Sequence, residues 1–145
     1  DVSAAVEETA ESFRDSSAAA GHDLTVDVPV GITYHGDEAA VRQLTSILLD
    51  NAVKYALPGG TISVSLRRER RGIVLRSGNP CAPLSREELD KLFDRFYRPD
   101  QSRTAATGGF GVGLSIARGI AEAHHGSITA DCPEEGRIEF TAELK

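Results

Sequence analysis

The sequence Leu48-Leu49-Asp50-Asn51-Ala52-Val53-Lys54-Tyr55 combines apolar and polar side chains on one predicted helix. That helix is expected to run from about Glu38 to Ala56, with Asp37 as its N-cap and Pro58-Gly59-Gly60 ending it. An apolar stripe along it is expected to face a core, and it consists of Leu44, Leu48 and Ala52. The segment therefore places polar chemistry at the edge of a core.

Three polar side chains share one side of this helix, because Asn51, Lys54 and Tyr55 are spaced i, i+3 and i+4. An amide oxygen can ligate a hard cation such as magnesium, and a lysine can balance phosphate charge. The alternative is a lysine that extends its apolar stem over the core, beside an amide that caps the helix end. The segment alone leaves both interpretations open.

The remaining pattern predicts alternating helices and short strands. A first helix is expected from Val2 to Ala20, ended by Gly21, and a later one from Arg86 to Phe93, with Ser85 and Glu88 as a capping box. Another helix is expected to begin after the glycine series at 109–113, run to His124 and close at Gly126. Period-two alternation predicts about six strands, at residues 24–28, 32–34, 61–68, 72–77, 127–131 and 137–144. The first two are expected to pair, and 79–85 to form a turn.

This order of elements predicts an α+β fold, a two-layer α/β sandwich with about three helices on a mixed, mostly antiparallel sheet. Hairpins are expected around the Arg70-Arg71-Gly72 turn and across 133–136. The length of 145 residues fits a single domain, residues 1–145.

A second chemical signal is the series Gly109, Gly111 and Gly113 directly before a predicted helix. Glycines let backbone amides approach an anion, and a helix N-terminus favours negative charge. Hinges and tight turns use the same residues, so the series alone is weak. No Gly-Lys-Ser or Gly-Lys-Thr follows it, and no strand directly precedes it, which disfavours a Walker A loop and a dinucleotide fingerprint.

An aromatic and basic stretch, Phe93-Asp94-Arg95-Phe96-Tyr97-Arg98, lies ahead of the glycines, and Arg103 follows it. Phe93 and Phe96 are interpreted as core anchors. Arg98 and Arg103 fall in a polar segment, where a guanidinium could make charge-assisted bonds to a triphosphate. Ordinary surface charge is the alternative.

Taken in this order, the three segments resemble one family, the catalytic ATP-binding domain of bacterial two-component sensor histidine kinases. Residues 48–55 are similar to its N box, residues 93–98 to its F box, and Gly109-Phe110-Gly111-Val112-Gly113-Leu114 to its second glycine box. The resemblance covers nearly the whole chain. It implies the Bergerat ATP-binding fold with ATP and Mg2+ as cofactors.

The resemblance also implies roles for individual residues. Asn51 would ligate magnesium, Lys54 would meet phosphate oxygens and Tyr55 would lie against the adenine. Arg98 and Arg103 would contact phosphates, and Asn79 would stand where the family's aspartate reads the adenine amino group. The glycine-box residues Gly109, Gly111, Gly113 and Leu114 complete the expected ATP site. An asparagine oxygen can accept the same hydrogen bond as the aspartate.

Three positions depart from the family pattern. Ile47 stands where an N-box asparagine is usual, so one polar contact near the metal is expected to be absent. Cys81 and Pro83 replace the two glycines of the first glycine box, which predicts a stiffer turn. These departures keep open a degenerate nucleotide-binding regulatory module. Another Bergerat-fold ATPase, or an anti-sigma-factor serine kinase, ought to lack the F box.

No histidine here has the context of a phosphoacceptor, and His124 and His125 are expected to be structural residues at a helix end. The resemblance therefore implies a protein-histidine kinase catalytic domain that donates the γ-phosphate of ATP to a histidine on a separate dimerisation domain of the same protein, with a response regulator downstream. No catalytic residue beyond those that position ATP is expected on this chain.

Composition bounds the remaining possibilities. A formal charge of -6 argues against broad nucleic-acid binding, and no apolar run is long enough to span a bilayer. Two cysteines are too few for a disulfide framework and lack zinc-ligand spacing. We expect a cytoplasmic domain without direct membrane contact, the cytosolic part of a membrane-anchored sensor.

Overall fold

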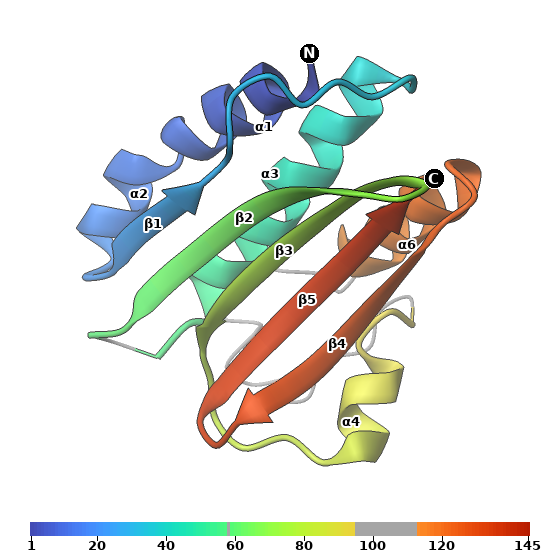
Figure 1. Cartoon of the computed structure of the whole chain (residues 1–145). Helices are drawn as coiled ribbons and strands as arrows, with labels where there is room; N and C mark the ends of the chain where they lie inside the picture. Colours follow the sequence, from blue (N-terminus) through green and yellow to red (C-terminus); the bar gives the residue numbers. More distant parts are fainter. Residues whose placement is uncertain (58, 95–112) are drawn as a thin grey trace.

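The computed structural model describes residues 1–57, 59–94 and 113–145. One five-stranded sheet, of order β1-β2-β3-β5-β4, forms one layer (Figure 1). Its strands are β1 (Asp23–Asp27), β2 (Thr61–Glu69), β3 (Gly72–Pro80), β4 (Ser127–Glu134) and β5 (Arg137–Leu144). β1 runs parallel to β2, and every other neighbouring pair is antiparallel. The predicted mixed, mostly antiparallel sheet is confirmed.

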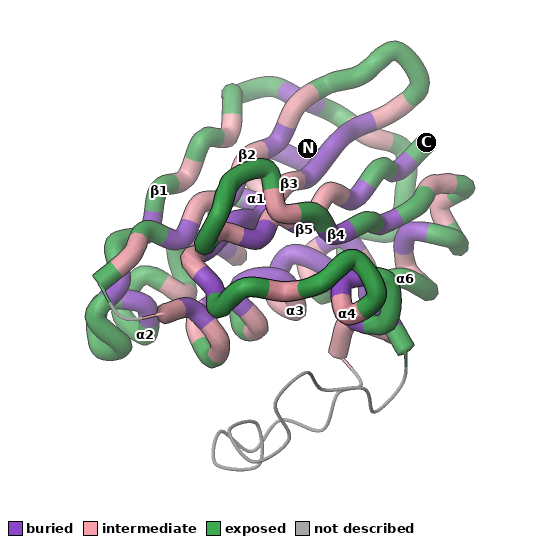
Figure 2. Tube along the Cα trace, turned by 90° about the horizontal axis from the view of Figure 1, so that it is seen from below, coloured by how far each residue is buried: buried purple, intermediate pink, exposed green. Residues whose placement is uncertain are grey.

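Helices cover one face of this sheet. They are α1 (Val2–Glu11), α2 (Arg14–Ala19), α3 (Glu38–Tyr55) and α6 (Gly113–Ala123), while the short α4 (Arg86–Lys91) lies beside β4. Figure 1 shows α3 behind the middle of the sheet, between α1 and α6, and Figure 2 shows the strands and helices as two layers. The predicted two-layer α/β sandwich is therefore confirmed.

The core lies between these layers because each element directs one apolar face inward. On β3, Ile73 and Leu75 face the helices, and β2 and β5 contribute buried residues such as Leu66 and Phe140. From α3 come the predicted stripe residues Leu44, Leu48 and Ala52, all at most 1% exposed. Burial of this face, rather than helix propensity, is what holds α3 on the sheet.

The predicted strand at residues 32–34 is wrong. This segment does not join the sheet, and β1 pairs with β2 instead. The backbone groups of Ile32 are bonded to the start of α1: its carbonyl oxygen accepts from the N–H groups of Val2 and Ser3, and Ser3 Oγ accepts from its N–H. Capping of a helix N-terminus thus replaces strand pairing.

The first predicted helix is two helices, separated at Ser12 and Phe13. Ser12 Oγ donates to the Thr9 carbonyl oxygen at 2.6 Å, and the Phe13 N–H bonds to Ala10 three residues back. A serine side chain that bonds its own helix offers the backbone an alternative to continuing. Gly21 ends the second helix with a φ of 83°, as predicted.

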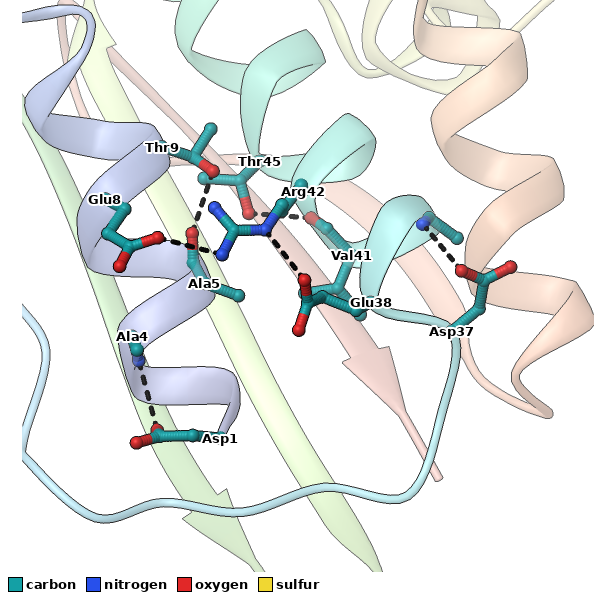
Figure 3. Close-up of polar contacts among 11 residues, drawn as sticks. Asp1, Ala4, Ala5, Glu8, Thr9, Asp37, Glu38, Val41, Arg42 and Thr45 are labelled. Carbon is teal, nitrogen blue, oxygen red and sulfur yellow. Dashed lines mark hydrogen bonds and ion pairs between the residues drawn. The ribbon is translucent and has the colours of Figure 1, made fainter.

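Polar contacts join α1 to the start of α3 (Figure 3). The Arg42 guanidinium contacts Glu8 of α1 at 2.8 Å and Glu38 of its own helix at 3.4 Å. Asp37 caps α3 by accepting from the Ala40 N–H, which confirms its predicted role. These contacts are on the surface, so they orient the helices more than they stabilise them.

His124 connects the end of α6 to the start of α3. Its Nδ1 lies 2.9 Å from the Ile120 carbonyl oxygen, and its Nε2 accepts from the Asp37 N–H at 3.3 Å. His125 has a φ of 60° and turns the chain into Gly126. The predicted structural role of this helix end is confirmed.

Within the described ranges, no helix is both long and apolar enough to cross a membrane.

Candidate functional site

The flank of α3 that faces α6 carries the predicted polar residues. Val41, Leu44 and Leu48 point into the core, and the 3.6-residue period then places Tyr55, Asn51 and Lys54 progressively farther out on one side. Tyr55 and Asn51 are half-buried, whereas Lys54 is exposed. The helix therefore presents an aromatic ring, an amide and an ammonium group in order from core to solvent.

The Lys54 ammonium pairs with Asp50 of the same helix, with Nζ 3.1 Å from Oδ2. Both side chains are well exposed, at 39% for Lys54 and 53% for Asp50. An i, i+4 pair in solvent contributes only about 0.3 to 0.5 kcal/mol. A phosphate with a higher charge density can therefore take Lys54 from Asp50 at little cost.

The start of α6 lies against the same flank of α3. A Cβ built on Gly113 would be 3.5 Å from Cγ2 of Ile47, which precedes Asn51 by one helical turn. The next residue, Leu114, packs half-buried against the core. The N-terminus of α6, a helix end whose dipole favours an anion, thus begins beside the N-box side chains. The packing of α6 on α3 also explains why an apolar residue stands at position 47, because the Ile47 side chain contacts the first turn of α6.

Asn79 lies inside the core face of β3, two residues beyond the predicted end of that strand. The predicted turn at 79–85 is wrong in its first two residues, because Asn79 pairs with Ile138 and Pro80 with Arg137 of β5. β5 holds this end of β3 in the sheet. Asn79 is 2% exposed, so its amide is fixed in place rather than free in a loop.

The oxygen of this buried side-chain amide lacks a hydrogen-bond partner among the described residues. Asn79 Nδ2 donates to the Pro80 carbonyl oxygen at 2.9 Å, whereas Oδ1 has no hydrogen-bond partner among the described residues. A buried carbonyl without a partner costs about 1 to 3 kcal/mol. The bond from Nδ2 fixes which end of the amide points away from Pro80. The strand thus holds an acceptor ready for an external donor.

The same Pro80 carbonyl ties the end of α3 to the end of β3. It accepts from the Leu57 N–H at 3.1 Å, just beyond the α3 residues Lys54 and Tyr55. α3 therefore contacts two other predicted regions: the end of β3, through Leu57, and the first turn of α6, through Ile47. Arg98, Arg103, Gly109 and Gly111 lie outside the described residues, so their predicted roles stay predictions.

Sequence reasoning missed Ser77. It precedes Asn79 by two residues on the same face of β3, is 1% exposed, and its Oγ also has no partner in the described part of the chain. The signal was present, because a serine follows Ile73 and Leu75 in the inward-facing alternation. Two unpaired oxygens in succession mark this part of the core face as polar.

Cys81 and Pro83 do not occupy equivalent environments. Cys81 is buried and donates its N–H to the Gly136 carbonyl oxygen at 2.9 Å, so this part of the expected glycine box is anchored to the β4–β5 turn. Pro83 is exposed and precedes Ser85, which with Glu88 forms the predicted capping box of α4.

Asn51 is a residue that could contact a magnesium ion held mainly by a ligand. Across the described ranges, no three His, Cys, Asp or Glu residues come together as a metal cluster. Asn51 offers one neutral amide oxygen at the rim of the core. Magnesium usually keeps several waters and takes few protein ligands when phosphates also bind it. Asn51 would thus supply one contact, and phosphate oxygens and water the others.

Comparison with solved structures identifies the fold. The catalytic domain of the histidine kinase ThkA, in a nucleotide-free form, superposes with a TM-score of 0.80 over 97% of this chain and 90% of that one, at 22% identity. The histidine kinase AdeS of Acinetobacter baumannii gives a TM-score of 0.76 over 98% of this chain and 63% of its own, also at 22% identity. The fold is that of histidine kinase catalytic domains.

Sequence comparison extends this result. Residues 36–145 match the family described as histidine kinase-, DNA gyrase B-, and HSP90-like ATPase. The chain belongs to this family. It is 37% identical over 133 residues to the signal transduction histidine-protein kinase BaeS of Escherichia coli, and 43% identical over 95 residues to the sensor protein DltS of Streptococcus agalactiae. These matches cover 92% and 66% of this chain, but only 28% and 24% of the two relatives.

Proposed function

We propose that this chain is the ATP-binding catalytic domain of a two-component sensor histidine kinase. It binds Mg-ATP between α3, the end of β3 and the start of α6, and presents the γ-phosphate to a histidine on a separate dimerisation domain. A response regulator then receives the phosphate. The two relatives, a signal transduction histidine-protein kinase and a sensor protein, are several times longer than this chain, which supports a full-length protein with further domains.

The observation that carries the proposal is the buried Oδ1 of Asn79 beside the end of α3, which has no hydrogen-bond partner in the part of the chain that the structure describes. An exocyclic amino group, such as that of adenine, donates the hydrogen bond that this oxygen lacks. Tyr55 offers a ring for the flat base at the same end of α3. The nucleotide is thus oriented by one hydrogen bond and one apolar contact, a pattern typical of small-molecule sites.

The phosphates would extend from this base site along the α3 flank. Lys54 leaves Asp50 to meet a phosphate oxygen, and the first turn of α6 offers its N–H groups. A magnesium ion bound with the nucleotide would supply charge neutralisation at the phosphates. Asn51 would hold that ion through its amide oxygen. The chain contributes positioning and charge neutralisation, which are the main requirements of phosphoryl transfer.

Calorimetric titration of the chain with ATP tests the proposal, once with magnesium and once with a chelator. We expect saturable binding that weakens without magnesium and weakens at least about tenfold in Lys54→Ala, because a charge-assisted phosphate contact is lost. Arg14→Ala is the matched control. It removes a similar surface pair, which Arg14 at the start of α2 makes at 2.8 Å with Glu11 at the end of α1, and should leave binding unchanged.

Absence of saturable ATP binding in the presence of magnesium would refute the kinase proposal and favour the degenerate regulatory module. A second readout follows the reaction itself. Mixed with labelled ATP and the dimerisation domain of its full-length protein, the chain should transfer acid-labile phosphate to that partner and not to itself.

A further inference from the structure

A hollow with a volume of about 290 Å³ lies at the end of the sheet where β2 turns into β3. Three segments that are distant in sequence line it, namely residues 33–35, residues 68–72 and Lys145, and we call it the hairpin hollow. Figure 1 shows the β2–β3 turn beside the end of β5. A space of this volume is at the lower end of the range for small-molecule sites.

The hairpin hollow is separate from the proposed nucleotide site. Gly72 begins β3 at the hollow, and Asn79 lies seven residues further along that strand, which is about 23 Å in extended chain. The hairpin turn is also packed directly on the end of β5, because a Cβ built on Gly72 would be 1.8 Å from the Leu144 carbonyl oxygen. The hollow is therefore a feature of the opposite end of the sheet.

Hydrogen bonds hold the walls of the hollow together. The Arg68 guanidinium donates to the Thr33 carbonyl oxygen at 3.2 Å, which joins β2 to the segment at 33–35. The Tyr34 hydroxyl donates to the Lys145 carbonyl oxygen at 3.1 Å, which joins that segment to the residue after β5. Burial raises the pKa of Tyr34, so its hydroxyl stays protonated and adds no negative charge. The three walls are thus fixed relative to one another.

The hollow carries an excess of positive charge. Arg68, Arg70 and Arg71 line it, and Glu69 supplies one carboxylate among the described lining residues. None of these three arginines forms an ion pair within the described part of the chain. By contrast, carboxylates pair with Arg14, Arg42, Arg67, Arg76, Arg86 and Arg118. Unneutralised cations are therefore concentrated here, although the whole chain has a formal charge of -6.

Arginines grouped in this way suit an anion with several charged oxygens. A guanidinium presents its N–H groups as a planar fork that matches the oxygens of a phosphate. One exposed ion pair contributes little, so an anion with a single charge would gain little from any one arginine. An anion with two linked phosphoryl groups can contact more than one arginine at once. Its negative charge also matches the excess of the three arginines over Glu69.

We propose that the hairpin hollow binds a small anion that contains two or more phosphoryl groups, with Arg68, Arg70 and Arg71 as its contacts. The volume of the hollow favours a small molecule over a protein partner, which would need about 800 Å² of contact surface on this chain. The proposal does not rest on the nucleotide site at the other end of β3.

Titration of the ¹⁵N-labelled chain with sodium pyrophosphate, at constant ionic strength and without magnesium, tests this site. The backbone amides of residues 33–35 and 69–72 should shift and saturate with a Kd of about 0.1 mM, while those of residues 51–57 and 79 stay in place. Inorganic phosphate should bind at least about tenfold more weakly, because it offers one phosphoryl group. Citrate that binds as tightly as pyrophosphate would overturn the preference for phosphoryl groups.

A double variant and a neighbouring control test the arginines. Arg70→Gln combined with Arg71→Gln should weaken pyrophosphate binding at least about tenfold, because charge-assisted bonds are lost. Arg67→Gln is the matched control. It removes one positive charge from the same hairpin, but Arg67 pairs with Asp27 at 2.5 Å and does not line the hollow. Its pyrophosphate affinity should stay within about twofold of the original, a free-energy change of less than RT.

Three results overturn the proposal. The first is no saturation up to about 10 mM pyrophosphate. The second is an equal loss in Arg67→Gln and in the double variant, which would indicate a general positive field. The third is a set of shifts at residues 51–57 that Lys54→Ala abolishes, which would place pyrophosphate in the nucleotide site.

The map of amide shifts is measured on the unmodified chain, so it decides the question even if a variant fails to fold. Calorimetry with Mg-ATP is a separate measurement. Failure of the hairpin hollow to bind pyrophosphate is therefore distinguishable from failure of the proposed function.

Discussion

Replacing Asn79 with leucine should stabilise the ligand-free chain and weaken its binding of nucleotide. The stability change follows from two opposed effects. Removing the unpaired Oδ1 ends a desolvation cost of about 1 to 3 kcal/mol, while losing the bond from Nδ2 to Pro80 costs about 1 kcal/mol. The Pro80 carbonyl is not left unsatisfied, because it still accepts from the Leu57 N–H at 3.1 Å.

The net expectation is a gain of about 1 kcal/mol in the free energy of unfolding, or a melting temperature about 2 to 4 °C higher. Chemical denaturation without nucleotide measures this gain. Calorimetry with Mg-ATP should show an affinity about 10- to 100-fold lower, because the donor on the base finds no acceptor. The two changes have opposite signs, which a merely structural amide would not produce.

Asn79→Asp is the matched variant. It keeps an acceptor and removes the donor, so we expect nucleotide affinity within a few-fold of the original. The ligand-free chain should be less stable at neutral pH, since a buried carboxylate would face the Pro80 carbonyl oxygen. The reasoning is refuted if Asn79→Leu loses stability and retains full affinity, because Asn79 would then serve the fold alone.

Three further predictions concern stability and are measured by denaturant unfolding. Gly126→Ala should cost about 2 kcal/mol or more, because its Cβ would lie 1.6 Å from the Glu143 carbonyl oxygen, whereas Gly119→Ala, with nothing within 4 Å, should gain up to about 1 kcal/mol. Equal stabilities of these two variants would contradict the expected collision at Gly126. Burial raises the pKa of Cys81 from 9.0 to about 11, so the contribution of its neutral thiol to stability is complete below pH 9 and lost as pH rises through 11. Across that window the chain with Cys81 should therefore lose stability relative to Cys81→Ala. Parallel curves of stability against pH for the two chains would contradict this. Ser85→Ala should lower stability by about 1 kcal/mol by removing the capping box of α4, and no change would show that α4 contributes nothing to the cooperative unit.

Local patterns sufficed for most elements of the fold. Asp37, Ser85 and Gly21 end or begin helices where their side chains or backbone freedom predict it. Strand pairing was harder to predict from the sequence, because it depends on contacts between residues that are distant in sequence. The segment at 32–34 alternates like a strand, yet the backbone groups of Ile32 bond to the start of α1. Period-two alternation in the sequence cannot tell whether the segment pairs with a neighbouring strand or bonds to the start of a helix.

In the candidate site, too, local relations could be predicted from the sequence and contacts between distant segments could not. Spacing alone placed Asn51, Lys54 and Tyr55 on one flank of α3, because a helix fixes that relation. The unpaired state of Asn79 Oδ1 could not be predicted, since it depends on how β3 and the end of α3 meet. The contact between Gly113 and Ile47 likewise exists only once α6 packs against α3.

One carbonyl oxygen serves two parts of the molecule. Pro80 accepts both the N–H that follows α3 and the amide of Asn79. A push along the axis of α3 therefore reaches this oxygen and, through it, the plane of the amide. In a longer protein whose other domains bear on α3, that oxygen would transmit a displacement of α3 to Asn79, the residue that we propose reads the base.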